Sequence, residues 1–427
     1  MFAGGVTLDW QLNPLDILAR WPSDQSIFML HSARPDARWS RYTVIAQSTE
    51  AVRYQDGRTL FSDPQSELAK KCPLTHQPFT DLRRIFEADA NQSLWLGTLG
   101  YDLARSIEHL PHPTTNDRHW PNYQLERCDG WLVYDNQTNQ WTAHGTYKHE
   151  LPALHVNAER SEASGTELSF HAGPLAPNQS ALQVKASIQR AIDYIAAGDV
   201  FQVNLAQRFT SDFNGSPRAF YANLCKQSPA WYGAYGELTR FNNDEPQHTL
   251  ASISPELFLD VSSAGAITTR PIKGTRPSSD DADTLRDSDK DRAELAMIVD
   301  LMRNDLGRVC SYGSIRVQEP RTIESHPTVH HGVATITGQL HPSRDLIDLL
   351  RATIPGGSIT GAPKVRAMQI IDELEPARRG AYCGAIGMIH AQRALLNIAI
   401  RTVMIEQDKV NGEGRADVWV GGGIVAD

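Results

Sequence analysis

One lysine stands in a local sequence that suits a reactive amine. Lys273 lies between Pro271 and Gly274, and Arg270 and Arg276 stand three residues to either side. A free lysine has a pKa of about 10.4, and it becomes a nucleophile only where burial or nearby positive charge lowers that pKa. We expect the two arginines to supply this charge, which makes Lys273 a candidate nucleophile. The alternative is an ordinary lysine at the polar end of a strand.

Two glycine-rich segments are candidate anion-binding sites. Backbone N–H groups beside glycine can approach a ligand closely, and the start of a helix favours negative charge. The first segment, just before a predicted helix, contains Gly356, Gly357, Ser358, Thr360, Gly361 and Lys364. The second contains Gly421, Gly422 and Gly423. Because the GxxxxGK[ST] pattern of a phosphate loop is absent, a carboxylate suits these segments as well as a phosphate.

An acid stands on an otherwise apolar helix face. Within residues 291–305, Glu294 shares a face with Ile298 and Leu301 at helical spacing. A carboxylate in such a place needs a partner, which is either a metal ion or a nearby cation. The cations within reach along the helix are Arg292, Arg303 and Arg308.

Two further side chains are candidates for substrate contact. Arg401 follows the apolar strand 395–400, where a guanidinium suits bidentate binding of a carboxylate. His331 offers an imidazole for proton transfer. A single histidine is more often an ordinary core residue, and both readings of His331 stay open at this point.

These residues depend on the elements that carry them. Lys273 follows a predicted hairpin of strands 257–261 and 266–269. A helix over residues 184–195 should end at Gly198 and be followed by a strand over 201–209. Residues 142–178 show little periodicity, and we interpret their latter part as a linker. The sequence thus predicts an α/β (α+β) fold with an N-terminal domain of residues 1–174 and a catalytic domain of residues 175–427.

Composition narrows the class of protein. The 427 residues carry a net charge of −9, and this negative charge is not typical of a protein that binds nucleic acid. No apolar run approaches the ~18 residues that cross a bilayer, and no leader pattern opens the chain, so we expect a cytoplasmic protein that binds no membrane. The five cysteines are odd in number and form no CxxC pair, which is typical of reduced thiols.

Several motifs, in order along the chain, resemble those of the chorismate-utilising enzymes. They lie at residues 198–205, 254–256, 269–277, 291–295, 303–309, 355–364, 400–402 and 421–427. Together they cover the chain from about residue 180 to its last residue, and the set is far more specific than any one of them. The resemblance implies a fold of packed antiparallel sheets with surrounding helices and a central cleft.

The resemblance also implies roles for single residues. Glu294 would hold Mg²⁺, which binds a substrate carboxylate, and His331 would lie near the leaving hydroxyl of chorismate. Substrate contacts would come from Thr275, Arg401, Lys364 and both glycine segments. Gln202 stands where relatives that add water to chorismate carry a lysine base, so ammonia is the expected nucleophile.

Lys273 further selects the reaction within this family. Relatives that form anthranilate carry alanine at this position, whereas lysine implies attack on ring carbon C2 as the C4 hydroxyl leaves. Ammonia then adds at C4 and expels the lysine, which gives 4-amino-4-deoxychorismate on the path to para-aminobenzoate and folate. Two alternatives stay open, namely anthranilate synthesis and a catalytically inactive chorismate-binding or regulatory subunit.

The resemblance implies partners as well. No GxCxG motif of a glutamine amidotransferase surrounds any cysteine, so a separate glutaminase subunit would supply the ammonia. Ser32, Arg41 and Tyr42 match a region that surrounds a bound tryptophan in relatives. The family pattern continues past residue 427 into a helix with a second magnesium-binding glutamate, so we expect a truncated form or an incomplete metal site. Met388 stands where a substrate-contacting tyrosine is usual, which predicts an altered pocket.

Overall fold

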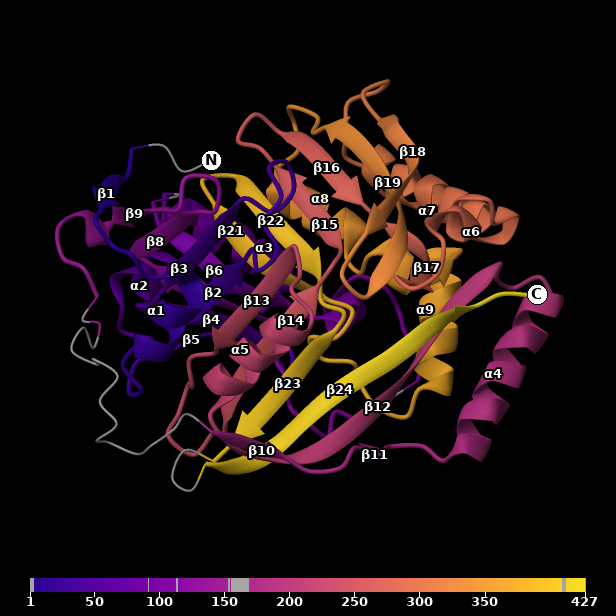
Figure 1. The fold of residues 1–427 in the computed structure, drawn as a ribbon, viewed down its shortest axis with the longest axis horizontal. Coiled ribbons are helices and arrows are strands. Elements are labelled where there is room, and N and C mark those ends of the chain that lie inside the picture. Colours follow the sequence, from indigo (N-terminus) through magenta and orange to yellow (C-terminus); the bar gives the residue numbers. More distant parts are fainter. Residues whose placement is uncertain are drawn as a thin grey trace.

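Strands dominate the structure and form two large antiparallel sheets. The computed structural model describes residues 4–90, 92–112, 114–152, 154, 169–408 and 412–426. Buried side chains of both sheets belong to one apolar core, which includes Phe28 and Val44 from the first sheet and Leu96 and Ile386 from the second. Figure 1 shows the helices at the outside of this pair of sheets. The expected fold of packed antiparallel sheets with surrounding helices is confirmed.

The first sheet runs across the whole length of the chain. Its spatial order is β1 (Val6–Leu8), β9 (Gln140–Gly145), β8 (Gly130–Asp135), β3 (Tyr42–Ala46), β2 (Phe28–His31), β13 (Tyr232–Glu237), β14 (Gln247–Ser254), β23 (Thr402–Gln407), β24 (Glu413–Ile424), β12 (Gln202–Gly215) and β10 (Phe170–Ala172). Two short strands, β11 (Ala176–Pro177) and β20 (Gly361–Ala362), also pair with β12. The pairing of β12 with β24 extends from Val203 opposite Ile424 to Asn214 opposite Glu413, and Figure 1 shows it as a long ribbon.

The second sheet carries the strand with the candidate nucleophile at one edge. Its order is β17 (Ile272–Pro277), β19 (Val329–Gln339), β16 (Ala266–Arg270), β15 (Leu257–Val261), β22 (Arg393–Ile398), β21 (Ala385–His390), β6 (Leu94–Leu99), β7 (Tyr123–Cys128), β4 (Glu50–Gln55) and β5 (Arg58–Phe61), with β18 (Arg316–Ser325) paired to β19. The β2–β13 and β6–β21 pairs join strands from either side of residue 174. A boundary at residue 174 therefore does not coincide with a division between sheets.

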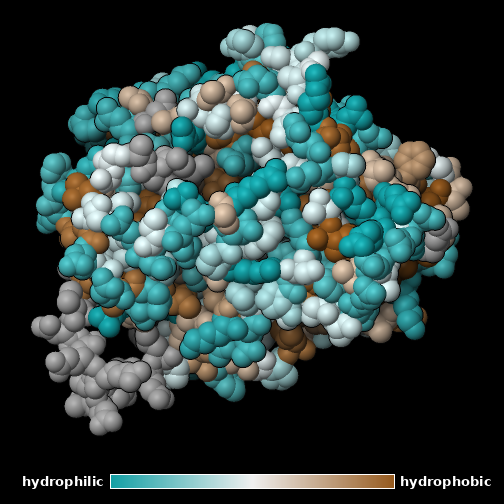
Figure 2. All heavy atoms as spheres, turned by 45° about the horizontal axis from the view of Figure 1, so that its top comes forward, coloured by the Kyte–Doolittle hydropathy of each residue, from teal (hydrophilic) through white to brown (hydrophobic). Residues whose placement is uncertain are grey.

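The helices pack on the outer faces. They are α1 (Pro14–Arg20), α2 (Glu67–Lys71), α3 (Pro78–Ala88), α4 (Ala181–Ala196), α5 (Pro217–Gln227), α6 (Ala282–Arg286), α7 (Asp289–Gly307), α8 (Leu346–Thr353) and α9 (Lys364–Leu374), with short 3-10 turns η1 (Tyr101–Ser106), η2 (Thr146–Lys148) and η3 (Gly357–Ile359). Within the described ranges, no helix is long and apolar enough to cross a membrane. Hydrophilic residues predominate on the face drawn in Figure 2, with hydrophobic ones scattered among them.

Local sequence explains where the predicted elements begin and end. A capping box joins Ser180 and Gln183 at the start of α4, and Gly198 follows its end with a φ of +85°. The predicted hairpin is confirmed by the pairing of Val261 with Ile267. The segment 142–178 contains the end of β9, η2, β10 and β11, so its two ends carry regular structure. Residues 155–168, which make up much of the predicted linker, lie outside the described part.

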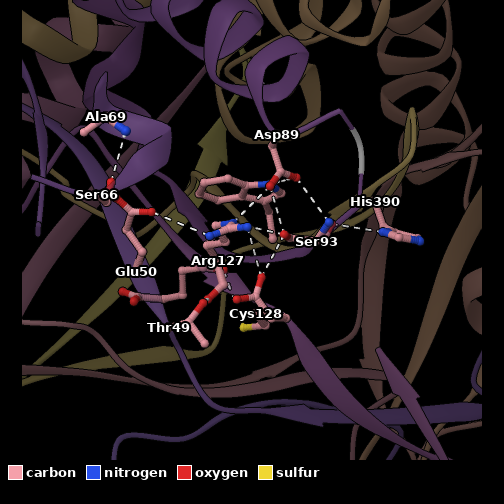
Figure 3. Close-up of polar contacts among 12 residues, drawn as sticks. Thr49, Glu50, Ser66, Ala69, Asp89, Ser93, Arg127, Cys128 and His390 are labelled. Atoms are coloured by element: carbon pink, nitrogen blue, oxygen red, sulfur yellow. Dashed lines mark hydrogen bonds and ion pairs between the residues drawn. The ribbon is translucent and has the colours of Figure 1, made fainter. Parts of the chain in front are cut away.

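A polar network fixes the start of β6. The Nε atom of Arg127 donates to Asp89 Oδ1 and to Ser93 Oγ, both at 3.0 Å, and its other nitrogens face Glu50 and Asp129 (Figure 3). Ser93 O also lies 3.0 Å from Nδ1 of His390, the last residue of β21. These contacts hold β6 against its neighbours in the second sheet, and β6 leads directly into η1.

Candidate active site

A cavity of about 590 Å³ brings together residues from distant parts of the chain. Its lining includes Asn204, Glu256, Lys273, Thr275, Asp291, Glu294, His331, Ser358, Ile359, Tyr382, Arg401, Trp419, Gly421, Gly422 and Gly423. These residues come from both sheets, from segments that connect their strands, from α7 and from the η3 turn. A larger hollow of about 1110 Å³ lies elsewhere, beside the start of α5. Its buried cation Arg218 is already paired with Glu237 at 2.7 Å, so the smaller cavity is the better candidate site.

Lys273 reaches this cavity from β17. Gly274 has a φ of +83°, and a Cβ atom there would lie 2.8 Å from Leu285 Cδ1, so only glycine fits beside the lysine. Burial lowers the pKa of the Lys273 amine, and the carboxylates of Glu256 and Glu294 oppose this shift. The amine is thereby brought closer to its neutral, nucleophilic form.

The expected effect of the two flanking arginines was wrong. Arg270 forms an ion pair with Glu324, and its guanidinium lies 3.8 Å from the centre of the Trp39 ring. Arg276 forms an ion pair with Asp291 at 2.6 Å. Both positive charges are matched by acids, and the cause of the lowered Lys273 pKa is removal from water.

Glu256 is a site residue that the sequence analysis did not predict. Its side chain is 3% exposed, and it accepts a hydrogen bond of 2.6 Å from the Ser358 hydroxyl. Burial raises its pKa to about 7, although the Ser358 hydrogen bond and the charge of Lys273 act in the opposite direction. A carboxyl group with this pKa can give or take a proton near neutral pH. The available signal was an acid placed between two apolar strands, at the end of the 254–256 motif.

His331 is held between Thr275 and Arg401. Its Nδ1 atom lies 2.9 Å from Thr275 Oγ1, and its Nε2 atom lies 3.2 Å from Arg401 Nη2. Arginine only donates hydrogen bonds, so Nε2 is the acceptor and Nδ1 carries the proton that is donated to Thr275. Burial and the charge of Arg401 lower the pKa of His331 to about 3. The imidazole is therefore neutral at physiological pH.

Arg401 is the cation best placed to bind an anion. It lines the cavity and is partly buried, and removal from water lowers its pKa. Within the described residues, no ion pair joins Arg401 to a carboxylate. A guanidinium that is shielded from water and lacks an acidic partner is suited to a ligand carboxylate.

Glu294 lines the same cavity and forms no ion pair among the described residues, although its charge acts on the Lys273 amine. Of the arginines considered as partners, Arg292 pairs with Asp289 at 3.0 Å and Arg303 pairs with Asp300 at 2.8 Å. None of the ion pairs among the described residues includes Glu294, and none of the described His, Cys, Asp and Glu side chains forms a group of three suited to a metal. Mg²⁺ commonly uses only one or two protein carboxylates and takes its other oxygens from water and substrate. Glu294 fits such a site.

The first glycine segment divides between the cavity and the core. Ser358 lines the cavity, whereas Cβ atoms at Gly356 and Gly357 would lie 2.7 Å from Ile398 and 2.9 Å from Leu301. The Thr360 hydroxyl donates to the carbonyl of Gly356 at 3.0 Å, which closes the turn on itself. These contacts make the segment a tightly packed turn that presents Ser358.

The residues at the start of α9 contact other parts of the protein. Gly361 pairs with Val203 in β12 and has a φ of +145°. The Lys364 ammonium forms an ion pair with Asp305 and donates to the carbonyls of Thr353 at 3.2 Å and Pro355 at 2.9 Å. Thr360, Gly361 and Lys364 lie outside the cavity lining, and substrate contacts from them stay a prediction. The Lys364 side chain turns inward and balances the buried acid Asp305.

The second glycine segment forms one wall, with Gln202 behind it. Gly421, Gly422 and Gly423 line the cavity, and a Cβ atom at Gly423 would lie 2.7 Å from Gln202 Nε2. Gln202 is fully buried, and neither polar atom of its amide has a hydrogen-bond partner among the described residues. The amide therefore lies next to the cavity wall with its hydrogen-bonding capacity unused.

Two aromatic residues of the lining were missed by the sequence interpretation. The rings of Tyr382 and Trp419 are stacked, with centres 5.6 Å apart and planes within 6°. Met388, by contrast, is 2% exposed in β21 and pairs with Leu96 and Leu395 in the core. The methionine does not reach the cavity lining, and its effect on the pocket stays a prediction.

The residues matched to a tryptophan site lie away from this cavity. The Ser32 hydroxyl donates to the carbonyl of Tyr42 at 2.7 Å, and Arg41 pairs with Asp135 at 2.6 Å. These contacts join β2, β3 and β8 within the first sheet. Tryptophan binding there stays a prediction.

Comparisons with known proteins identify the family of this chain. A family model described as chorismate binding enzyme matches residues 27–427, and the chain belongs to this family. Aminodeoxychorismate synthase component 1 of Escherichia coli (strain K12) is 36% identical over 446 residues, which cover 97% of this chain and 94% of that protein. Anthranilate synthase component 1 of Thermus thermophilus is 33% identical, covering 94% and 87% respectively. The crystal structure of anthranilate synthase component I from Streptococcus pneumoniae superposes with a TM-score of 0.71 at 25% identity, and it covers 100% of this chain and 96% of that one.

Proposed function

We propose that this chain is the synthase component that aminates chorismate to 4-amino-4-deoxychorismate. The observation that carries the proposal is Lys273, a partly buried amine with a lowered pKa in the cavity that also contains Arg401. The extended similarity to aminodeoxychorismate synthase component 1 supports the same reaction. Arg401 provides a seat for a chorismate carboxylate, since it has no acidic partner among the described residues.

The first step forms a covalent bond to the enzyme. The neutral Lys273 amine bonds to ring carbon C2, the two conjugated ring double bonds each shift by one position, and the bond between C4 and its hydroxyl oxygen breaks. The hydroxyl must take up a proton to leave as water. Glu256 is suited to give this proton, because a pKa of about 7 keeps much of it protonated at neutral pH. His331 has a pKa of about 3 and instead orients Thr275 and Arg401 through its two hydrogen bonds.

The second step replaces the lysine by ammonia. Ammonia bonds to C4, both ring double bonds shift back, and the protonated lysine nitrogen leaves C2 as a neutral amine. The added nitrogen keeps its three hydrogens as an ammonium group, so one proton and one ammonia are consumed for each water released. Mg²⁺ at Glu294 would neutralise charge on a substrate carboxylate when it is bound.

The proposal includes a second subunit. The five cysteines lie outside any GxCxG motif, so ammonia would come from a separate glutamine amidotransferase with which this chain forms a heterodimer. A cytoplasmic location is the expected setting for such an enzyme.

One experiment separates the candidate reactions. The purified chain is incubated with chorismate, Mg²⁺ and an ammonium salt, and the products are resolved by chromatography. We expect a para-amino product, with a rate that increases with pH as ammonium deprotonates, and no product from glutamine. An ortho-amino product would favour anthranilate synthesis, which the similarity to the Thermus thermophilus protein keeps as the second candidate. Bound chorismate without any turnover would favour a regulatory subunit.

A further inference from the structure

Three aromatic rings and one guanidinium are stacked at the cavity wall, and we call them the ladder: Tyr101, Arg379, Tyr382 and Trp419. The guanidinium carbon of Arg379 is 4.5 Å from the centre of the Tyr101 ring and 5.8 Å from that of Tyr382. Tyr382 is in turn stacked on Trp419. Tyr382 and Trp419 line the cavity, whereas Tyr101 and Arg379 are buried outside its lining.

Arg379 also holds the backbone of two other lining residues. Its guanidinium is 1% exposed and donates to the carbonyl of Asn204 at 2.7 Å and to that of Ile359 at 3.2 Å. Its charge is balanced by Glu375, which accepts two hydrogen bonds of 2.9 and 2.6 Å. Glu375 Oε1 further accepts a hydrogen bond of 2.8 Å from the backbone of Ala206. One buried cation thereby connects β12, the η3 turn and the Tyr382 ring.

The N-terminal part of the chain sets the position of this cation. Tyr101 belongs to η1, directly after β6, and its backbone N–H donates to the carbonyl of Gly380 at 2.9 Å. Asp102 Oδ2 accepts a hydrogen bond of 2.7 Å from the backbone of Gly380, the residue after Arg379. Because β6 is itself fixed by the Arg127 network (Figure 3), this contact ties the cavity wall to the second sheet.

We propose that Tyr101 and Arg379 are positioning residues for chorismate, acting through Tyr382, Asn204 and Ile359. The inference rests on the proposed function, since it assigns these residues to the same cavity. A cation between two ring faces prefers one arrangement, so the ladder restricts the wall to one position. Displacement of a bound substrate by about 1 Å can cost about 100-fold in rate.

Two substitutions at Tyr101 separate the ring from its hydroxyl. The Tyr101 hydroxyl is buried without a hydrogen-bond partner among the described residues, so Tyr101→Phe removes an unsatisfied group and keeps the ring. Tyr101→Leu removes the ring face. We expect Tyr101→Phe to match the wild type in chorismate affinity and turnover. We expect Tyr101→Leu to bind chorismate at least 10-fold more weakly and to lose at least 10-fold in kcat/KM.

A control variant separates positioning from general loss of stability. Phe86 is also a buried ring, 6% exposed, and packs edge-on against Trp95 in the N-terminal half. Phe86→Leu should lower the melting temperature about as much as Tyr101→Leu while leaving chorismate affinity unchanged. Where Tyr101→Leu does not fold, Tyr101→Met and Arg379→Lys are measured in its place, and the same loss of affinity is expected of them.

The measurements are chorismate binding by calorimetry, turnover with ammonium and thermal unfolding. Binding is read without turnover, so a wild-type chain that binds chorismate and forms no amino product would overturn the proposed reaction and still allow the ladder to be tested. Folded Tyr101→Leu or Arg379→Lys with wild-type affinity and kcat/KM would overturn the positioning role. Equal losses in Tyr101→Phe and Tyr101→Leu would do so too, because they would assign the effect to the hydroxyl.

Discussion

Nη2 of Arg401 donates a hydrogen bond of 3.2 Å to Nε2 of His331, and this contact fixes the chemical state of both residues. The imidazole must offer a lone pair to the arginine, so it is neutral and its Nδ1–H donates to Thr275. The arginine keeps its remaining N–H groups for another partner. His331 therefore orients Arg401 as a neutral imidazole, which is a different role from that of an imidazolium that donates a proton.

The first prediction concerns the remaining N–H groups of Arg401. Arg401→Met should weaken chorismate binding about 10- to 100-fold, because a hydrogen bond to a charged group contributes roughly 1.5–3 kcal/mol. Stability should change little, since no acidic partner of Arg401 among the described residues would be left unpaired. Calorimetric titration with chorismate measures the affinity. Arg303→Met, which removes an exposed guanidinium paired with Asp300, serves as the control. Wild-type affinity in Arg401→Met would show that Arg401 does not bind a chorismate carboxylate.

The second prediction follows from the raised pKa of Glu256. A carboxyl group with a pKa of about 7 in the folded chain and 4.5 as its ordinary value binds more protons in the folded state between those pH values. Its contribution to the free energy of unfolding therefore falls as pH rises from about 4.5 to 7. Glu256→Gln keeps an acceptor for Ser358 and removes this dependence.

Relative to wild type, Glu256→Gln should gain stability as pH increases from 5 to 8, by up to about 3 kcal/mol. Urea unfolding at several pH values measures the difference. The same variant should lose most of its turnover, because it cannot give a proton to the leaving hydroxyl. A stability difference that is independent of pH would show that Glu256 is ionised throughout this range.

The sequence predicted the residues of the site better than the contacts around them. One cavity contains Lys273, Glu294, His331, Arg401 and the second glycine segment. The sequence predicted them because local motifs indicate the reactive residue types, and the resemblance to a known family assigns those motifs to one site. The pairing of Lys364 with Asp305, and of Arg270 with Glu324, carries no periodic signal. Such pairings join residues far apart along the chain, and they decide which cations are left free for a ligand.

The sequence did not predict which strands pair in the two sheets, for a similar reason. Each strand shows its own alternation of buried and exposed residues, but the neighbour it pairs with is chosen by the whole fold. The β6–β21 pair joins Leu99 to Ala385, and a boundary drawn from composition near residue 174 gives no hint of it. The contributions of Tyr101 and Tyr382 to one ladder depend on that pairing.

The third prediction tests magnesium at Glu294. Glu294→Gln should weaken Mg²⁺ binding at least 10-fold in the presence of chorismate, because a carboxylate ligand is replaced by a neutral amide. Isothermal titration with Mg²⁺, with and without chorismate, gives the affinity independently of turnover. Glu373→Gln on α9, whose carboxylate accepts hydrogen bonds from Tyr194, is the control. Equal Mg²⁺ affinity in wild type and Glu294→Gln would place the metal elsewhere.

The fourth prediction concerns the covalent role of Lys273. Lys273→Ala should fold, since the amine lies partly buried in a cavity wall. Lys273 forms no ion pair among the described residues, so its removal breaks none. It should lose most of its para-amination, at least 100-fold in kcat, while binding chorismate through Arg401. Lys185→Ala, at an exposed position on α4, should match the wild type.

The adduct itself can be observed by mass spectrometry. When wild-type protein is held with chorismate and Mg²⁺ without ammonia, the peptide that contains Lys273 should gain a mass derived from the ring. Because attack requires the neutral amine and a protonated Glu256, the fraction of protein modified in a fixed time should first increase with pH and then decrease as Glu256 loses its proton. An active Lys273→Ala variant, together with an unmodified wild-type peptide, would assign Lys273 an electrostatic role and remove the covalent step.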